Sequence, residues 1–475
     1  MIGRLAFRSL TAHPIRSAVL AAGFGLGVAV MAILLGVAAI VLEQARSPEQ
    51  VGGGDVLIRL GPQVPGRLLL AGTLQSDALR PRIRVASPFH QGDLYLHQDG
   101  RTIRVFAHGG IPSLERALGD RETRDIAAWQ DSPADVAWKS DSPNRLLRTV
   151  DRFHTVPDAP EWADSWAEWL YFNGRAGTTR FYLTFLVGPH TSDGQRAAGV
   201  RLQLERDGKM ETYGSGGSIS DEDAMKAPDL TIGASSVRLD GMRYRVHVDV
   251  AGAGQSHVVG DITVDASPGR LVPPLEIHGA RGWVTGYVVP VMSGPLGGTL
   301  SVEPGPHRLS TSAPNGTRPQ EVSLAGGIGY HDHNWGFWRG VSWQWGQAQH
   351  DDLSFIYGRV FPPREAADPE RFPGFVGALG PDGPIGFATN VRIDETNDAA
   401  GRPQAIAVHA HGDALDLSMH FEVGSSVTTP MTQGPLANGV NFLQMRGTYT
   451  VSGRAGDRDI GFSAPGSAET FRGMR

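Results

Sequence analysis

Short extended segments recur between about residue 162 and residue 451, with turn residues between them, often at the spacing of roughly 8–12 residues that is typical of β-sandwiches and β-barrels. The clearest segment, Arg243–Val250, is apolar at every second position and charged or polar between. A strand with one buried and one exposed face in an antiparallel sheet has this pattern. About 300 residues of such segments exceed one small sandwich, so we expect two β-barrels or sandwiches in tandem, meeting near residues 295–320.

Composition excludes several classes of protein. Lys and Arg total 43 and Asp and Glu total 49, so the formal net charge is −6, without the basic surplus of a nucleic-acid binder. Hydrophobic residues make up 40% of the chain and charged residues 19%, which indicates a folded rather than a disordered protein. The chain has no cysteine, which excludes disulfides, thiol nucleophiles and iron–sulfur clusters. We expect no nucleic-acid partner and no cofactor.

The first 42 residues differ in character from the rest. Arg4, Arg8 and Arg16 precede an uncharged run, Ser17–Leu42, which Glu43 ends. As a helix this run would rise about 39 Å, enough to span a hydrocarbon core of about 30 Å. The positive-inside rule then keeps residues 1–16 in the cytoplasm, so we predict a single-pass helix of the inner (cell) membrane at 17–42 and a periplasmic remainder. A long cleavable signal peptide and a buried soluble helix are the alternatives.

Residues 1 to about 145 resemble the start of ABC-transporter permeases of the MacB/FtsX type. The resemblance rests on five stretches: Leu5–Leu10, His13–Ser17, Gly54–Ile58, Val85–Pro88 and Gly109–Ser113. It implies a permease-like extracytoplasmic region at 46–154, which we expect to be a small α+β region. Such permeases carry three more membrane helices near the C-terminus, and this sequence shows no second apolar run of that length. The resemblance therefore implies an anchor that associates with ABC-transporter subunits.

The remainder of the chain divides at turn-rich sequence. We expect a first β domain at 160–300, a second at 301–455 and a tail at 456–475. The predicted fold class is therefore mainly β, after a membrane helix and a small α+β region.

Two aromatic motifs carry the chemistry that the sequence offers, Trp166–Gly174 and Gly329–Trp338. Successive side chains of a strand point to opposite faces. The two faces of a strand at the second motif would carry three polar or aromatic residues each: His331, His333 and Trp335 on one, and Tyr330, Asp332 and Asn334 on the other.

Each motif also has an interpretation that involves no catalysis. His331 and His333 supply only two ligands, whereas a catalytic zinc typically has three from the protein. The pair His409 and His411 has the same weakness. We therefore expect no metal site. The second motif could instead be a structural polar network inside a barrel, with Trp335 as packing. Glu168 and Trp169 favour a structural role.

The stretch Tyr330–Gly336 is similar to the signature of the AttH-like and carotenoid 1,2-hydratase (hydroxyneurosporene synthase) family, and Trp166–Phe172 resembles the opening motif of that family. The resemblance covers residues of about 160–455. It implies that both predicted β domains are lipocalin-like barrels with an apolar interior. Members of the family bind or act on hydrophobic, often isoprenoid, molecules, by hydration or by pericyclic cyclisation.

The resemblance also implies site residues. In the hydratases a His-x-Trp pair, matched here by His333 and Trp335, and a downstream Tyr-x-Asp are implicated; Tyr357 matches the tyrosine, but Arg359 occupies the aspartate position. A guanidinium stays protonated and cannot give a proton to an alkene, although it can bind an anionic head group. The candidate catalytic residues are His331, Asp332, His333, Trp335 and Tyr357. The candidate ligand-binding residues are Trp169, Tyr171, Trp335, Trp343, Tyr357 and Arg359.

Three functions follow from these patterns. The first is a membrane-anchored, periplasmic, lipocalin-like protein that binds a hydrophobic isoprenoid or lipid in association with an ABC transporter. The second is a hydratase, cyclase or isomerase in which His333 carries the proton and the aromatic faces of Trp335 and Tyr357 stabilise a carbocation. The third is a structural subunit that uses both barrels as docking surfaces.

Overall fold

A computed structural model describes 14–15, 17–19, 22–24, 28, 30–31, 56–58, 66–75, 79–98, 101–120, 128–139, 142–303, 318–381, 383–412, 414–430 and 441–472. In this described part of the chain, no helix is both long and apolar enough to cross a membrane. Most of the predicted transmembrane helix at 17–42 lies outside the described residues, so it stays a prediction.

The chain forms two compact units. The first comprises Met1–Arg59 and Val85–Ala137, and its described core is the antiparallel hairpin of β1 (Phe89–Gln98) and β2 (Arg101–Gly110). Two helices accompany the hairpin: α4 (Pro112–Leu118) and α6 (Pro133–Lys139). The buried Glu115 of α4 accepts a hydrogen bond from the Ser87 hydroxyl at 2.5 Å. The described part of this unit thus combines one β-hairpin with short helices.

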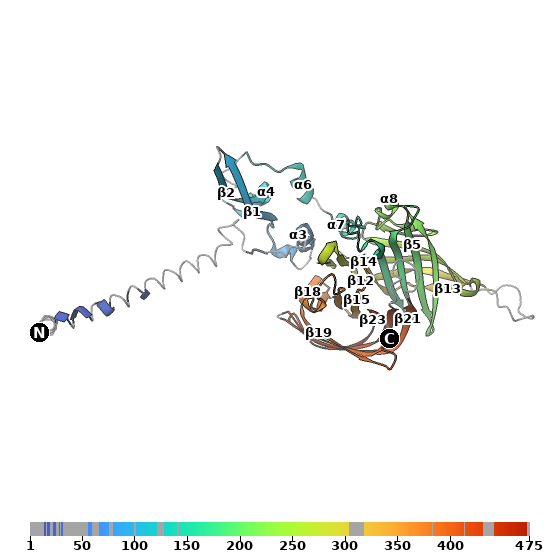
Figure 1. Ribbon diagram of the computed structural model, residues 1–475. Helices are drawn as coiled ribbons and strands as arrows, with labels where there is room; N and C mark the ends of the chain where they lie inside the picture. Colours follow the sequence, from blue (N-terminus) through green and yellow to red (C-terminus); the bar gives the residue numbers. More distant parts are fainter. Residues whose placement is uncertain are drawn as a thin grey trace, which may run out of the picture. The chain divides into compact units, whose positions relative to one another are not determined.

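The second unit, Leu60–Arg84 with Trp138–Arg475, is built on a closed antiparallel barrel (Figure 1). The strand order is β10-β12-β14-β3-β4-β5-β6-β9, and pairing of β9 with β10 closes it. Its strands are β3 (Trp166–Ala176), β4 (Thr179–His190), β5 (Arg196–Arg206), β6 (Lys209–Ile219), β9 (Arg243–Gly252), β10 (His257–Asp265), β12 (Val284–Glu303) and β14 (Gly327–Phe337).

Shorter elements accompany the two sheets. The strands are β7 (Thr231–Ile232), β8 (Ser235–Asp240), β11 (Val272–His278) and β13 (Gln320–Ser323). The α-helices are α3 (Gly66–Gln75), α7 (Pro143–Val150) and α8 (Asp221–Ala224), and the 3₁₀ turns are Arg80–Arg82, Ala163–Ser165, Ala253–Gln255, Ala280–Gly282 and Pro369–Arg371. Helix α7 begins with Ser142, whose hydroxyl accepts a hydrogen bond from the Arg145 amide, and it buries Leu146, Leu147 and Val150.

The C-terminal part forms a second antiparallel sheet of nine strands. Their order is β18-β17-β16-β15-β23-β22-β21-β20-β19, and in the described residues the edge strands β18 and β19 do not pair, so this sheet is a half-barrel. Its strands are β15 (Ser342–His350), β16 (Leu353–Phe361), β17 (Phe375–Gly380), β18 (Gly383–Ala388), β19 (Asn390–Asn397), β20 (Pro403–His411), β21 (Leu415–Pro430), β22 (Asn441–Ala455) and β23 (Arg458–Arg472).

The prediction of a mainly β chain with tandem β domains is confirmed in this coarse form, with one closed barrel and one open sheet. The alternation in Arg243–Val250 also holds, because Tyr244, Val246, Val248 and Val250 are all buried in the barrel. Two details differ from the sequence-based division. The chain passes from the barrel to the second sheet between Phe337 and Ser342, later than residue 300, and the predicted tail contains β23, a central strand of that sheet.

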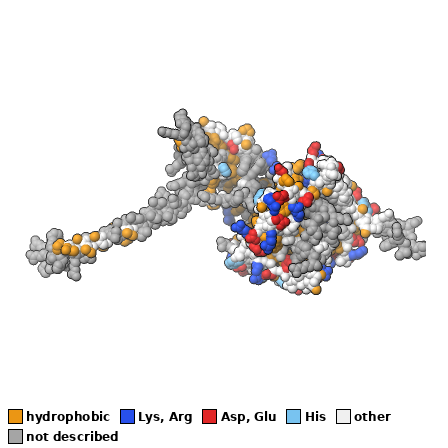
Figure 2. Space-filling view, in the orientation of Figure 1, with side chains coloured by type: hydrophobic (Ala, Val, Ile, Leu, Met, Phe, Trp, Pro, Cys, Tyr) orange, Lys and Arg blue, Asp and Glu red, His pale blue; other side chains and the backbone are white. Residues whose placement is uncertain are grey.

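Acidic and basic side chains lie beside one another on the face of the barrel unit that Figure 2 shows. The described surface in that view has no extended field of one sign, which agrees with the modest formal net charge of −6.

Candidate functional site

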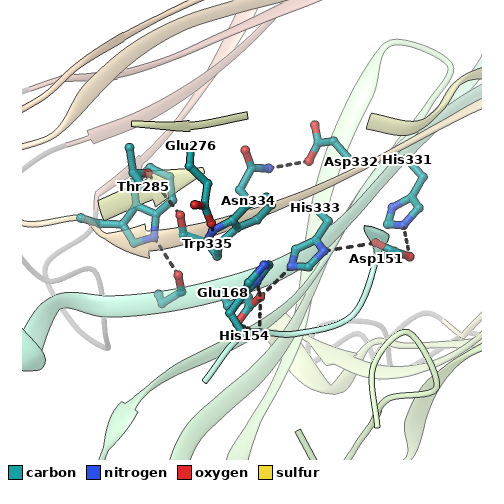
Figure 3. A network of polar contacts seen from close by, with 12 residues as sticks. Asp151, His154, Glu168, Glu276, Thr285, His331, Asp332, His333, Asn334 and Trp335 are labelled. Atoms are coloured by element: carbon teal, nitrogen blue, oxygen red, sulfur yellow. Dashed lines mark hydrogen bonds and ion pairs between the residues drawn. The ribbon is translucent and has the colours of Figure 1, made fainter. Parts of the chain in front are cut away.

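Strand β14 separates two polar regions, because its side chains alternate between the barrel interior and the side covered by the second sheet. Paired residues of an antiparallel ladder share a face. His333 and Trp335 pair with Leu170 and Glu168 of β3, whose side chains point inward. Figure 3 shows the consequence: His331 and His333 are directed at Asp151, while Asp332 and Asn334 contact each other on the opposite side.

The inner region is centred on Asp151, which follows helix α7 and is fully buried. Its Oδ2 lies 3.0 Å from Nε2 of His331 and accepts a hydrogen bond from the Tyr244 hydroxyl at 2.8 Å. Nδ1 of His331 donates to the Tyr171 carbonyl at 2.9 Å, and the ring stacks on Phe172. Both ring nitrogens of His331 therefore lie at hydrogen-bond distance from oxygen atoms.

His333 joins Asp151 to a second buried carboxylate, Glu168. Its Nδ1 lies 3.3 Å from Oδ1 of Asp151, and its Nε2 lies 2.8 Å from Oε1 of Glu168. Burial alone would lower the pKa of His333, but the hydrogen bonds and charges of the two carboxylates raise it to about 9. Conversely, burial would raise the carboxyl pKa values, but the histidines lower that of Asp151 to about 2 and that of Glu168 below its usual value. We call Asp151, His154, Glu168, His331 and His333 the inner network.

The inner network also contains the donor set of a metal site. Candidate ligand atoms of His154, Glu168 and His333 all lie within 4.8 Å of one another. Oε1 of Glu168 is 2.7 Å from Nδ1 of His154 and 2.8 Å from Nε2 of His333, which are hydrogen-bond distances. Two ligands of one tetrahedral zinc ion would lie about 3.4 Å apart. Hydrogen bonding among the three side chains therefore accounts for their positions.

Trp335 packs the inner network from one side. Its ring stacks on His154 with centroids 4.2 Å apart, and its Nε1 donates to Glu276 at 3.1 Å. The paired residue on β12 is Gly286, where an added Cβ would lie 2.4 Å from the Trp335 ring. Glycine at 286 thus makes room for the indole. This geometry fits the non-catalytic interpretation of the motif, in which it forms a structural polar network and Trp335 serves as packing.

The outer face of β14 carries Asp332, which is 3% exposed. Its carboxylate accepts hydrogen bonds from the Tyr330 hydroxyl at 2.8 Å and from the Asn334 amide at 2.7 Å. Trp345 of β15 donates to the same Tyr330 hydroxyl at 3.1 Å, which links the barrel to the second sheet. No imidazole of the described residues bonds to this carboxylate, and burial outweighs its hydrogen bonds and raises the pKa of Asp332 to about 7.

Asp332 lines a cavity of about 280 Å³ between the barrel wall and the second sheet. The floor of the cavity is a grid of paired residues on four adjacent barrel strands, in the order β14, β3, β4, β5. One row of the grid reads Asn334, Trp169, Leu186, Gly199, and the next reads Asp332, Tyr171, Thr184, Arg201. The second sheet contributes the opposite wall, with Trp343, Trp345, Val360, Phe442, Gln444, Glu469 and Phe471. The cavity is therefore largely aromatic, with a few polar groups.

A second carboxyl group enters the cavity from the opposite wall. Glu469 of β23 is surrounded by protein, and it keeps some accessible area because it lines the cavity. Burial, together with the nearby charge of Asp332, raises the pKa of Glu469 to about 8. The pKa of Tyr171 is also raised, by burial and by Glu469. Two carboxyl groups that hold protons near neutral pH thus share one apolar cavity.

The structure distributes the predicted site residues over three places. Trp169, Tyr171, Trp343 and Asp332 line the cavity, whereas His331, His333 and Trp335 belong to the barrel interior. Tyr357 lies in the core of the second sheet, 3.3 Å from the Tyr449 hydroxyl. Arg359 is bound to Glu370 at 3.1 Å and to the Phe372 carbonyl at 3.1 Å. The His-x-Trp pair and the Tyr-x-Arg pair are therefore on different sheets and do not form one site.

Sequence reasoning missed Glu469 and Arg201. Glu469 lies in the segment predicted as a tail, and it has no polar or aromatic motif around it. Arg201 belongs to the extended segment Val200–Glu205, where polar residues at every second position indicate a solvated face. Only the pairing of β23 with β15, and the covering of β5 by the second sheet, bring these two residues to the cavity.

Comparisons with known proteins give distant matches. No family model matches the chain, and no curated protein matches it significantly. Among solved structures it is similar to an AttH-like protein from Nitrosomonas europaea, at 14% identity and a TM-score of 0.41 over 69% of this chain and 99% of that one. It is also similar to kievitone hydratase from Nectria haematococca (12% identity, TM-score 0.42, 68% of this chain and 94% of that one) and to CghA with Sch210972 (11%, 0.39, 70% and 96%). Such low values assign no function, and they add no support to the permease-like resemblance of the N-terminal segment.

Proposed function

We propose that the protein is an acid–base enzyme of the hydratase, cyclase or isomerase type that acts on an unsaturated hydrophobic substrate in the cavity. The observation that carries the proposal is the pair Asp332 and Glu469, whose pKa values are raised to about 7 and about 8 within an aromatic cavity. A general acid works best when its pKa lies near the operating pH. Carboxyl groups with strongly perturbed pKa values in a cleft are typical of functional sites.

Each carboxyl group has a role that its position supports. The protonated Glu469 gives its proton to one carbon of a double bond, and the aromatic rings of the cavity stabilise the resulting cation. In a hydration, water attacks the other carbon, and the Asp332 carboxylate accepts the proton that the water loses. In a cyclisation or isomerisation, the substrate carbon returns a proton to Asp332 instead. Transfer of that proton to Glu469 restores the enzyme.

The inner network has a positioning role in this proposal. It holds β14 against β3 from the barrel side through buried, paired charges, so that Asp332 projects at a defined place on the other side. His333 does not line the cavity, so the proton carrier proposed here is a carboxyl group and not that imidazole.

Proton transfer can be tested without knowledge of the natural substrate. The full-length protein would be incubated in D₂O with a panel of long-chain unsaturated acids, alcohols and hydrocarbons, and carbon-bound deuterium would be measured by mass spectrometry. We expect incorporation into at least one compound and a loss of roughly 10²- to 10⁴-fold in Glu469→Gln. The exposed Glu422 on β21 gives a matched control, Glu422→Gln, which should retain full activity. Equal labelling by Glu469→Gln and the wild type would refute the proposal.

The location of the protein is a separate proposal. We propose that residues 17–42 anchor the chain in the cell membrane, with the N-terminus in the cytoplasm; the uncharged run and the preceding arginines support this. A reporter fused after Arg475 should then be active only outside the cytoplasm. Association with an ABC transporter rests on the permease-like sequence alone, and co-purification of transporter subunits with the full-length protein would test it.

A further inference from the structure

Two polar side chains at the far end of the cavity from Asp332 have buried polar atoms that bond to no described residue. Arg201 and Gln203 are neighbours on one face of β5, and both line the cavity. Gln203 is 1% exposed, and neither its amide nitrogen nor its amide oxygen has a hydrogen-bond partner in the described structure. The Nε of Arg201 is likewise buried and unpaired. Buried polar groups are normally satisfied, so this end of the cavity needs an explanation.

The charge of Arg201 is also unbalanced. Burial lowers the pKa of Arg201, and no carboxylate in the described part of the chain lies close enough to oppose that shift. By contrast, Arg446 of β22 forms an ion pair with Glu205, which follows Gln203 on the same face of β5. Arg201 is partly buried, and a partly desolvated guanidinium without an anion is unfavourable. Such a group recognises a carboxylate or phosphate through paired N–H groups.

The register of the barrel strands relates this end of the cavity to the carboxyl pair. Asp332 pairs with Tyr171, Tyr171 with Thr184, and Thr184 with Arg201, so a single row crosses four strands. Neighbouring strands lie about 4.8 Å apart, so Asp332 and Arg201 are separated by roughly 14 Å along the row. An extended ligand can lie along this row, with one end at each polar group and its apolar middle against the aromatic rings.

We propose that Arg201 and Gln203 form an anion subsite, and that the substrate is an elongated unsaturated molecule with a single acidic group, most simply a carboxylate. One unpaired cation matches one negative charge, and the Gln203 amide can donate a further hydrogen bond to the same group. This inference rests on the proposed function only for the statement that the ligand is a substrate. The anion subsite itself follows from the unpaired groups.

Binding of simple amphiphiles tests the subsite apart from catalysis. Lauric acid, lauryl alcohol and lauryl phosphate would be titrated into the full-length protein at neutral pH, with the fluorescence of the cavity tryptophans as the readout. A hydrogen bond to a charged group contributes roughly 1.5–3 kcal/mol, so we expect the acid to bind about 10- to 100-fold more tightly than the alcohol. Arg201→Gln should remove this preference and leave alcohol binding unchanged. Preferential binding of the phosphate that also depends on Arg201 would support the subsite and identify its anion as a phosphate.

Arg359→Gln is the matched control, because Arg359 is bonded to Glu370 and lies outside the cavity lining. It should bind all three amphiphiles as the wild type does.

Arg201→Gln should also raise the melting temperature of the ligand-free protein by a few degrees, since it removes an unpaired charge. If Arg201 has a structural role instead, the substitution should lower the melting temperature. Equal affinities for acid and alcohol, or no binding of any amphiphile, would overturn the subsite. If acid and alcohol bind equally, loss of deuterium labelling in Glu469→Gln would still support the proposed function.

Discussion

The interior of the barrel and the cavity outside it each contain two carboxyl groups surrounded by protein, but the pKa values of the two pairs are shifted in opposite directions. Inside, the pKa values of Asp151 and Glu168 are lowered, because His331, His333 and His154 supply compensating contacts. In the cavity, burial raises the pKa values of Asp332 and Glu469, and the charge of Asp332 raises that of Glu469 further. Asp332 and His333 are neighbours on β14, yet Asp332 lines the cavity and His333 belongs to the inner network.

This contrast separates a stabilising role from a reactive one. Paired buried charges stabilise the folded state only as a set, and removal of one partner is strongly destabilising. Carboxyl groups that stay partly protonated reduce stability at neutral pH but are available for proton transfer. The predictions below therefore differ in sign between the two regions.

The largest effect is expected on catalysis at the cavity. Asp332→Asn should lower turnover, measured as deuterium incorporation, by roughly 10²- to 10⁴-fold. The same substitution should raise the melting temperature at pH 8 and leave it nearly unchanged at pH 4, because Asp332 is deprotonated in the folded state only above its raised pKa of about 7. If Asp332→Asn is fully active and less stable at pH 8, the role of Asp332 is a stabilising one, like that of the inner network.

Next in size is the loss of stability on breaking the inner network. His333→Ala leaves Asp151 and Glu168 without their shared partner, so we expect a decrease of about 3–5 kcal/mol in the free energy of unfolding. Urea denaturation of the wild type and the variant measures the difference. The exposed His409→Ala serves as the control and should be neutral. A neutral His333→Ala would show that the network does not stabilise the barrel.

The pH dependence of stability sharpens the comparison further. The pKa of His333 is raised from 6.5 to about 9, so its contribution to stability is complete below pH 6.5 and is lost as the pH rises through 9. The pKa of Asp332 is raised from 3.8 to about 7, so stability is also lost as the pH rises from about 4 to about 7.

The two contributions can be separated with variants. In a series of urea denaturations, His333→Gln should remove the decline above pH 7, and Asp332→Asn should remove the decline between pH 4 and 7. If both variants follow the wild-type profile, neither group titrates as the structure indicates.

The smallest effect is expected for ligand binding by the aromatic walls. Trp343 lines the cavity, whereas Trp335 packs on His154 in the barrel interior. Trp343→Ala should therefore weaken binding of lauryl alcohol by roughly tenfold, while Trp335→Ala should chiefly lower stability, by about 3–5 kcal/mol. The reverse result would return Trp335 to the ligand site that the His-x-Trp resemblance implies.

Alternation along the chain was sufficient to predict much of the local structure. The buried face of Arg243–Val250 and the division of β14 into a histidine face and an aspartate face both follow from a period of two. The first aromatic motif likewise indicated Trp169 and Tyr171, and Trp343 was a further candidate; the structure places all three around the cavity. These features depend on neighbours within one strand, which the sequence specifies directly.

Only the tertiary structure decided which distant residues lie against each face of a strand. Period two states that Arg201 and Gln203 share a face, but that face would be solvated if the second sheet did not cover it. Glu469, 137 residues after Asp332 in the chain, lines the same cavity only because β23 pairs with β15 beside the barrel. Tyr357 and Arg359 lie on a different sheet from His333 and Trp335, although their spacing in the sequence resembles a single site. Alternation determines the side of a strand on which a residue lies, whereas burial, charge balance and pKa depend on distant segments that fold against that side.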